Sequence, residues 1–212
     1  MFKLAIVAMG MTLAASAAAQ APAGAPIPPA EAAYRATAER ADRAFRAGDL
    51  SEALRLTEEA RAVAEVRLGP SHQLAFESLN DISVLHQLRG NLQAAVSPAL
   101  SAAGGLERVA GPDHPETLNA LANLAQLWVR LERKTEAEPL LRRVYEARER
   151  SLGLSNEATL FALLEWAIFL HRERRLAEIK PQLERGAETA RTALGADHVV
   201  ARDLADALRA AG

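Results

Sequence analysis

The sequence predicts an all-α protein built as a solenoid of antiparallel helix pairs. Four glycines recur at a fixed spacing of 42 positions, at Gly69, Gly111, Gly153 and Gly195. A fixed period in this range is typical of solenoids, in which each unit buries its apolar face by stacking on its neighbours. Half of the residues are apolar but only 4% are aromatic. This composition favours closely packed helices over sheets, which are rich in aromatic and β-branched residues.

The N-terminal segment, 1–30, lies outside the repeat and predicts an export signal followed by a leader. A short basic start precedes an apolar stretch, Leu4–Leu13, and the small residues Ala17–Ala19 are typical of a signal-peptidase site. The apolar stretch is too short to span a membrane comfortably, which argues against a membrane-spanning N-terminal helix. We therefore expect a signal peptide over 1–19, cleavage after Ala19 or Ala21, an Ala/Pro-rich disordered leader over 20–30, and an exported protein, either periplasmic or secreted.

The elements of the predicted repeat domain, residues 31–212, follow from the glycine period. A second set of breaks lies midway between the glycines, at Gly48, Gly90, Glu132 and Arg174. Each unit therefore has two helices, which we name A-type and B-type. A-type helices are expected at 31–47, 72–88, 114–131, 156–173 and 198–210. B-type helices are expected at 50–67, 92–109, 134–151 and 176–193.

The linkers between units carry helix-stop and helix-start residues. Each glycine is followed by Pro or a variable residue and then by Ser or Asp, as in Gly69-Pro70-Ser71 and Gly111-Pro112-Asp113. A left-handed glycine ends a helix, and a Ser or Asp oxygen caps the next one. The sequence thus predicts that Ser71, Asp113, Ser155 and Asp197 cap the A-type helices.

Small residues recur in register from unit to unit. These columns are Ala41, Ser83, Ala125 and Ala167 in the A-type helices, and Ala53, Ala95, Ala137 with Ala60, Ala102, Val144, Gly186 in the B-type helices. Small side chains at the same place in every unit predict a constant, close approach of neighbouring helices.

Three B-type helices contain helix-weakening residues. Pro98 and the Gly104-Gly105 pair lie inside the helix expected at 92–109, which predicts a kinked or mobile segment. Pro139 and Pro181 lie near predicted helix starts, where a missing N–H matters less. The charged last helix, 198–210, is expected to act as a solubilising cap.

At these residues the chain resembles the tetratricopeptide repeat, specifically its 42-residue kinesin light chain type. The resemblance rests on the linkers Leu68-Gly69-Pro70-Ser71-His72 and Ala110-Gly111-Pro112-Asp113-His114-Pro115, on Leu121-Ala122-Asn123-Leu124-Ala125, and on Glu136-Ala137-Glu138-Pro139-Leu140-Leu141. It covers essentially all of 31–212. It implies a right-handed superhelical solenoid of about four units plus a capping helix, with the A-type helices lining a concave groove.

The resemblance also implies where a peptide would bind. The asparagine of Leu-x-Asn-Leu-Ala commonly hydrogen-bonds a bound peptide in this family, and it corresponds to Asn123 here. Asp81 and Glu165 stand at the matching positions of the neighbouring units, so the usual asparagine ladder is altered. The expected groove residues are polar in two units and mainly apolar in the third: Asp81, Asn119, Asn123, Gln126, Arg130, Phe161, Leu164, Glu165 and Ile168. An alternative is that the apolar ones pack under helix 198–210, since exposed apolar patches normally need covering.

Other chemistry has weak support in the sequence. His72, His114 and His198 occupy equivalent places in separate units, too far apart to share a metal ion, and we expect structural roles for them. The net charge is −2 without a basic stripe, which argues against nucleic acid. The chain has no cysteine, which excludes a lipid-anchored lipoprotein, disulfides and thiolate metal sites. We expect no cofactor, because no phosphate-binding loop, nucleophilic serine motif or metal-binding His pair is present.

The predicted function is a non-enzymatic scaffold that binds a protein or peptide segment in its groove. Two other classes stay open. The first is a structural module that forms a homo-oligomer through its terminal helices, which an apolar stripe on 31–47 or 198–210 would support. The second is an enzyme with an unrecognised site, which a deep pocket with perturbed titratable groups would support.

Overall fold

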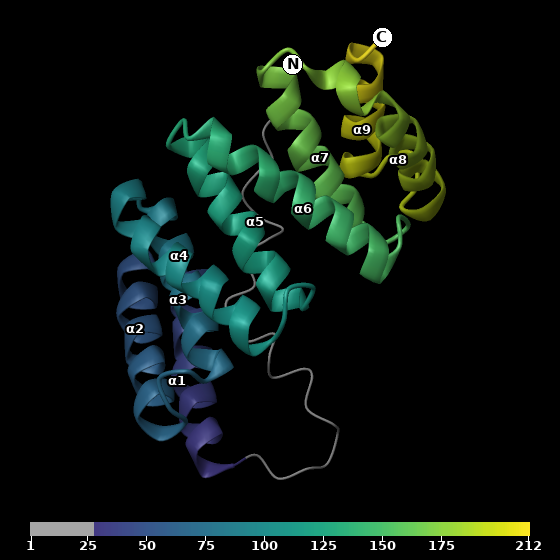
Figure 1. Cartoon of the computed structure of the whole chain (residues 1–212). Helices are drawn as coiled ribbons and strands as arrows, with labels where there is room; N and C mark the ends of the chain where they lie inside the picture. The colour runs from purple at the N-terminus through teal and green to yellow at the C-terminus, as the bar shows by residue number, and fades with distance from the viewer. Residues whose placement is uncertain (1–27) are drawn as a thin grey trace. The chain divides into compact units, whose positions relative to one another are not determined.

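The computed structural model describes residues 28–212, which form helices joined by short turns (Figure 1). In chain order these are α1 (Pro29–Arg46), α2 (Leu50–Arg67), α3 (Gln73–Leu88), α4 (Leu92–Val109), α5 (Pro115–Arg130), α6 (Lys134–Leu152), α7 (Glu157–Arg172), the 3-10 helix η2 (Leu176–Ile179), α8 (Lys180–Ala193) and α9 (Val199–Ala210). No strand occurs among the described residues. The all-α fold prediction is confirmed, and the helix bounds agree with the expected ones to within two residues everywhere except at α8.

The N-terminal predictions lie largely outside the described residues. The expected signal peptide, 1–19, and residues 20–27 of the expected leader are not among them. Helix α1 begins at Pro29, so residues 29 and 30 belong to the helix and not to the leader. A proline at this place is favourable because the first-turn N–H that it lacks has no partner within the helix.

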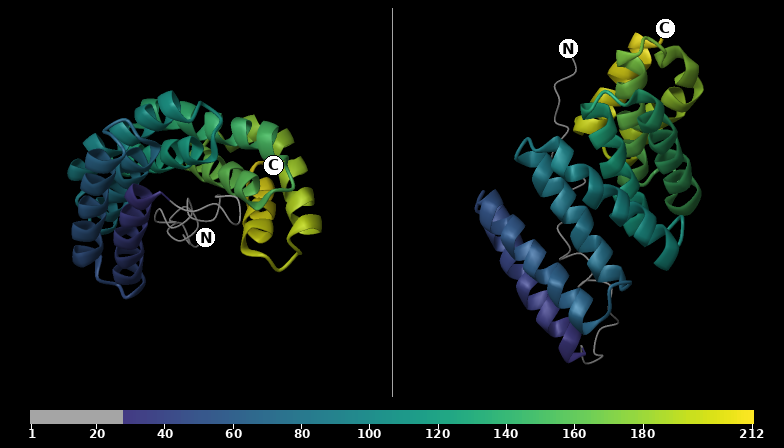
Figure 2. Two further views of the ribbon diagram at one scale, coloured as in Figure 1. Left: turned by 90° about the horizontal axis from the view of Figure 1, so that it is seen from below. Right: turned by 60° about the vertical axis from the view of Figure 1, so that its left-hand side comes forward.

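The chain divides into two compact units, residues 28–131 and residues 132–212. In the first unit α1 packs on α2, α2 on α3, α3 on α4, and α4 on α5, and the paired helices α1 and α2 lie side by side in both views of Figure 2. In the second unit α6 packs on α7, while α7, α8 and α9 pack on one another. The assignment of 31–212 to one repeat domain stays a prediction.

The columns of small residues lie at the helix contacts. Ser83 and Ala125 in the A-type helices are fully buried, as are Ala53 and Ala95 in the B-type helices. Two glycines lie where a neighbouring helix comes very close. A Cβ on Gly105 would lie 2.2 Å from the Phe76 ring, and one on Gly186 would lie 2.3 Å from Leu163 Cδ2. The close approach predicted from the sequence is therefore present in both units.

At two of the turns between paired helices, a residue other than glycine adopts the left-handed backbone conformation that glycine normally adopts. Gly48 and Gly90 both have φ of 79° at the A-to-B turns. At the equivalent turns Glu132 has φ of 59° and Arg174 has φ of 58°. A side chain with this left-handed backbone costs about 1 kcal/mol or more, so the repeat geometry overrides local preference at these two turns.

The last B-type helix differs from the prediction of a single helix over 176–193. It starts as the 3-10 helix η2, and α8 begins at Lys180 with Pro181 in its first turn. The proline has no N–H to donate to a carbonyl one turn earlier, so the backbone restarts there. By contrast, Pro139 lies inside α6 and not at its start. Pro98 likewise lies inside α4, which continues as one α-helix from Leu92 to Val109.

None of the described helices is both long and apolar enough to cross a membrane.

Candidate peptide-binding faces of the A-type helices

His72, His114 and Asn156 cap α3, α5 and α7, which corrects the prediction that Ser71, Asp113 and Ser155 do so. Helix α9 has no side-chain cap, so Asp197 does not cap it either. His72 Nδ1 accepts from the backbone N–H of Leu74, and His114 Nδ1 accepts from Glu116, both at 3.3 Å. Asn156 replaces the histidine in the next unit, and its Oδ1 accepts from Ala158 at 2.9 Å. An imidazole nitrogen can accept only when it carries no proton, so both caps require an unprotonated Nδ1. Sequence reasoning expected structural histidines but missed this role.

His198 occupies the same N-cap position before α9 but makes no side-chain cap. Its Nε2 lies 3.5 Å from Glu157 Oε1, at the start of α7. Among the described residues no group of three or more His, Cys, Asp or Glu side chains could hold a metal ion.

In the first unit, Asn123, which is predicted to contact a ligand, meets a polar side chain of the preceding A-type helix. Asn123 on α5 donates through Nδ2 to Oδ1 of Asn80 on α3, at 2.9 Å. Asn119, one turn earlier on α5, donates to Glu116 Oε2 at 3.4 Å. Equivalent faces of successive A-type helices therefore lie next to each other, as the resemblance implies.

The predicted residues of this face differ in their exposure. Asn123 and Asp81 are buried, with 6% and 5% of their surface exposed. Asn119 and Gln126 are partly exposed, and Arg130 is exposed. The part of this polar row that is open in the structure thus lies along α5, at Asn119, Gln126 and Arg130.

A buried carboxyl lies beside this row. Glu77 on α3 has 4% of its surface exposed and accepts a hydrogen bond from Gln73 Nε2 at 2.7 Å. Burial raises the pKa of the Glu77 carboxyl to about 7, the Gln73 amide opposes this, and the charge of Glu116 adds to it. Nearby, the buried Tyr34 hydroxyl of α1 lies 3.2 Å from Ser78 Oγ on α3. The interior of this unit is therefore polar where its A-type helices meet.

In the second unit, the predicted residues lie on α7. Leu164 is buried, whereas Phe161, Glu165 and Ile168 are partly exposed. Helix α9 packs against α7, and Leu204 of α9 and Leu163 of α7 both approach Gly186. Phe161 and Ile168 keep part of their surface accessible, and the pocket formed by Phe161, Leu164 and Ile168 stays a prediction.

A buried arginine on α6 was missed at the sequence level. Arg148 has 8% of its surface exposed, and its Nη1 donates to the carbonyl of Ala158 at the start of α7, at 3.3 Å. Burial lowers the pKa of the Arg148 guanidinium, and the Glu165 carboxylate opposes this. The sequence could have indicated that Arg148 is buried, because the residues at the same place in the other B-type helices are all apolar: Ala64, Leu106 and Ala190.

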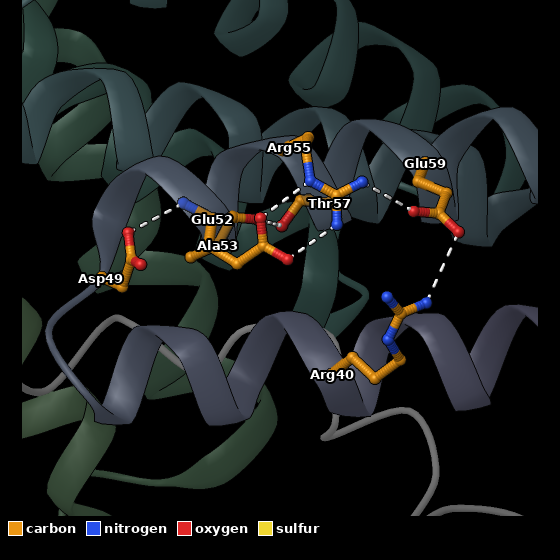
Figure 3. Close-up of polar contacts among 7 residues, drawn as sticks. All are labelled: Arg40, Asp49, Glu52, Ala53, Arg55, Thr57 and Glu59. Atoms are coloured by element: carbon orange, nitrogen blue, oxygen red, sulfur yellow. Dashed lines mark hydrogen bonds and ion pairs between the residues drawn. The ribbon is translucent and has the colours of Figure 1, made fainter.

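The α1–α2 pair is joined by a network of ion pairs on its surface (Figure 3). Arg55 on α2 binds Glu52 at 2.7 Å and Glu59 at 3.1 Å, and Arg40 on α1 lies 3.6 Å from Glu59. Asp49 begins α2 by accepting from the N–H of Glu52 at 3.0 Å. This surface of α1 and α2 is charged, and self-association through the terminal helices stays a prediction.

Comparison with known proteins agrees with the repeat pattern. The family model of the tetratricopeptide repeat matches residues 77–116 and 117–157. Among solved structures, the TPR-like repeats assigned to a kinesin light chain of Podosopora anserina align with a TM-score of 0.73 and 22% sequence identity, covering 87% of this chain and 89% of that one. A variant of those repeats gives the same TM-score and identity over 84% and 86%.

A third structure, BtubC (BKLC) from P. vanneervenii, aligns with a TM-score of 0.50 and 13% identity over 87% of this chain and 91% of that one. No curated protein sequence matches the chain. At these identities the structural likeness defines the fold, which is in general that of protein–protein interaction scaffolds and is typically not enzymatic.

Proposed function

We propose that this chain, which carries tetratricopeptide repeats of the kinesin light chain type, is a non-enzymatic scaffold that binds a protein or peptide segment on its A-type faces. The observation that carries the proposal is the row of polar side chains on α5 that stays open to solvent, at Asn119, Gln126 and Arg130. Beside this row, the buried contact of Asn123 with Asn80, at 2.9 Å, holds the equivalent face of α3 against α5. An extended peptide has unpaired backbone N–H and C=O groups, and amide side chains can both donate to and accept from them.

In this proposal each unit presents a binding face with its own chemistry. On α5, Asn119 and Gln126 hydrogen-bond the peptide backbone, and Arg130 contributes a positive charge. On α7, Phe161 and Ile168 are the apolar contacts, with Leu164 beneath them. Buried apolar side chains dominate the affinity of most interfaces, whereas polar groups fix register and orientation. We therefore expect the α7 face to bind its ligand mainly by apolar contact, and the α5 face to orient its ligand mainly by hydrogen bonds.

The proposal is tested by selecting short linear peptides from a random display library on the purified chain. Selected peptides should lose binding to the Asn119→Ala/Gln126→Ala variant and to Phe161→Asp. They should keep binding to the control Val66→Ala/Leu100→Ala, which alters exposed positions on the B-type helices α2 and α4. If the control variant loses binding and the A-type variants keep it, the ligand face has been assigned to the wrong helices.

We further propose that the protein is exported, as the segment 1–19 suggests. A fusion of residues 1–30 to a reporter enzyme that is active only outside the cytoplasm tests this. The expected result is reporter activity and a new N-terminus after Ala19 or Ala21. An uncleaved, inactive fusion would refute export by this signal.

A further inference from the structure

The buried Glu77 carboxyl belongs to the same column of the repeat as two of the proposed ligand contacts. Asn119 on α5 follows Glu77 by 42 positions, and Phe161 on α7 follows Asn119 by 42 more. The hydrogen bond from Asn123 to Asn80 shows that the A-type faces of α5 and α3 meet, and we call this surface the α3–α5 face. Glu77 is therefore the residue that α3 contributes where α5 presents Asn119.

Glu77 and Asn119 also lie beside the same carboxyl of α5. Asn119 Nδ2 donates to Glu116 Oε2 at 3.4 Å. The charge of Glu116 in turn acts on Glu77 and favours its neutral form. The two residues of the column are thus close in space as well as in the repeat.

The groups that α1 brings to this place do not favour a charge on Glu77. Burial raises the pKa of the Tyr34 hydroxyl of α1, and the carboxyls of Asp81 and Glu77 add to this. Arg35, one repeat before Glu77, is paired with Glu31 at 2.6 Å. The neighbours from α1 and α3 are therefore acids, or an arginine that already binds a carboxylate.

The two B-type helices that pack on α3 bring small or already engaged side chains. Helix α2 packs on the first turn of α3 through Ala60 and Ala64. Arg108 of α4 lies over the ring of Phe76, 5.6 Å from its centroid. These contacts also give Glu77 no counter-charge.

Glu77 can act like the amides of the open row when it is neutral. It has 4% of its surface exposed, and its pKa is raised to about 7, mainly by burial. About half of the molecules therefore hold the proton at pH 7. A protonated carboxyl has an O–H donor and a C=O acceptor, just as the Asn119 and Gln126 amides have N–H donors and a C=O acceptor.

The proton of neutral Glu77 has no acceptor in the part of the chain that the structure describes. Gln73 approaches the carboxyl as a donor, with its Nε2 at 2.7 Å from Glu77 Oε1. A buried O–H is normally hydrogen-bonded, and one without an acceptor costs stability. A backbone carbonyl of a bound segment supplies an acceptor of the right kind.

We propose that protonated Glu77 is a ligand-binding residue of the α3–α5 face and donates its O–H to a backbone carbonyl of the bound segment. The inference rests on the proposed function, because it requires the segment to lie on this face. Ionised Glu77 has no donor and repels a carbonyl oxygen, so the affinity is highest below about pH 7 and falls as the pH rises. The neutral fraction falls from about 0.9 at pH 6 to about 0.1 at pH 8, which raises the apparent dissociation constant about tenfold.

The probe is a peptide selected on the purified chain at pH 6 that loses binding to Asn119→Ala/Gln126→Ala. Fluorescence anisotropy should give about tenfold weaker binding at pH 8 than at pH 6. Glu77→Gln keeps a donor and an acceptor at every pH, so it should bind at pH 8 as tightly as the natural chain binds at pH 6. Glu58→Gln removes an exposed carboxylate of α2 and should leave the pH dependence unchanged.

Three results would overturn this inference while the proposed function stands. They are equal affinity of the natural chain at the two pH values, the same fall in affinity in Glu77→Gln, and tighter binding at pH 8. The last result would mean that a cation of the segment meets ionised Glu77. Unchanged helicity at both pH values is the folding check. If no selected peptide depends on Asn119 and Gln126, the proposed function fails on this face, and the role of Glu77 fails with it.

Discussion

At the scale of single residues, the turns show where the repeat geometry overrides residue preference. Arg174 stands in a left-handed conformation that Gly90 supplies at an equivalent turn. Arg174→Gly should therefore stabilise the protein by about 1 kcal/mol, and Gly90→Ala should destabilise it by a similar amount. No atom lies within 4 Å of a Cβ added at Gly90, so the effect there is purely one of backbone conformation.

Urea unfolding of both variants measures these changes. Arg172→Gly is the control, because Arg172 ends α7 in a helical conformation and glycine there should destabilise the helix. Destabilisation by Arg174→Gly would contradict the assignment of conformational strain to this turn.

The histidine caps give a second prediction. His114→Ala removes the acceptor for the N–H of Glu116 and should lower the free energy of unfolding by about 1 kcal/mol. His114→Asn should retain most of the stability, because Asn156 caps α7 in the same way. Thermal unfolding of the three proteins tests this, and an Asn variant as unstable as the Ala variant would mean that the imidazole acts through packing.

Glu77 predicts a pH dependence of stability. Its pKa is about 7 in the folded protein and 4.5 in an unperturbed carboxyl. Because the folded state holds the proton more tightly, this contribution to stability is complete below about pH 4.5. It is lost as the pH rises to about 7, by roughly 3 kcal/mol. Glu77→Gln should remove this loss, so the variant gains stability over the natural chain between pH 5 and pH 8.

Urea unfolding at several pH values measures the difference. Glu116→Gln should lower the pKa of Glu77, since the charge of Glu116 contributes to the raised value, so the loss becomes smaller and ends at a lower pH. Parallel pH profiles of the natural chain and Glu77→Gln would show that Glu77 is ionised in the folded protein at neutral pH.

At the scale of the element, the two adjacent glycines of α4 differ in their role: Gly104 only weakens the helix, whereas Gly105 makes room for a neighbouring side chain. A Cβ on Gly104 meets no atom within 4 Å, whereas one on Gly105 would overlap the Phe76 ring. Gly104→Ala should stabilise α4 by about 1 kcal/mol through helix propensity. Gly105→Ala should destabilise the protein by about 1–3 kcal/mol through overpacking, and calorimetric unfolding distinguishes the two. Equal effects of the two substitutions would show that α4 is not held against Phe76.

The helices were predictable because the period and the glycines mark both ends of each element. Details that depend on how a single side chain contacts its neighbours were not predictable. The sequence assigned the cap to Ser71 and Asp113 because their oxygens are common caps, but the backbone places the next residue, His72 or His114, at the N-cap. The start of α8 at Lys180 depends on Pro181. The sequence pattern placed this proline near a helix start but did not predict that a separate 3-10 helix, η2, would end before it.

The candidate site was predictable only as a set of positions on a helix face. The period places Asn123, Gln126 and Phe161 on the A-type helices, and the structure agrees. The repeat period gives no information on how much of each side chain is exposed, because this depends on every neighbouring side chain. For that reason the burial of Asp81 and Asn123, and the contrast with exposed Arg130, could not be obtained from the sequence.

At the scale of the whole molecule, the proposed function follows from repetition. Each helix pair adds one more A-type face, so a ligand can be bound by several weak contacts in series instead of one deep pocket. The central claim is that the A-type faces, and not the B-type ones, contact the partner.

Site-specific photo-crosslinking tests this claim most directly. A photoreactive amino acid is placed at Gln126 or Phe161 on the A-type helices, and at Val66 or Leu100 on the B-type helices, in the protein expressed in its own host. Val66 is 84% exposed and Leu100 is 49% exposed, so both are open to any partner that approaches. We expect the same partner protein to be crosslinked from positions 126 and 161 and not from 66 or 100. Crosslinks from 66 or 100 alone would contradict the account.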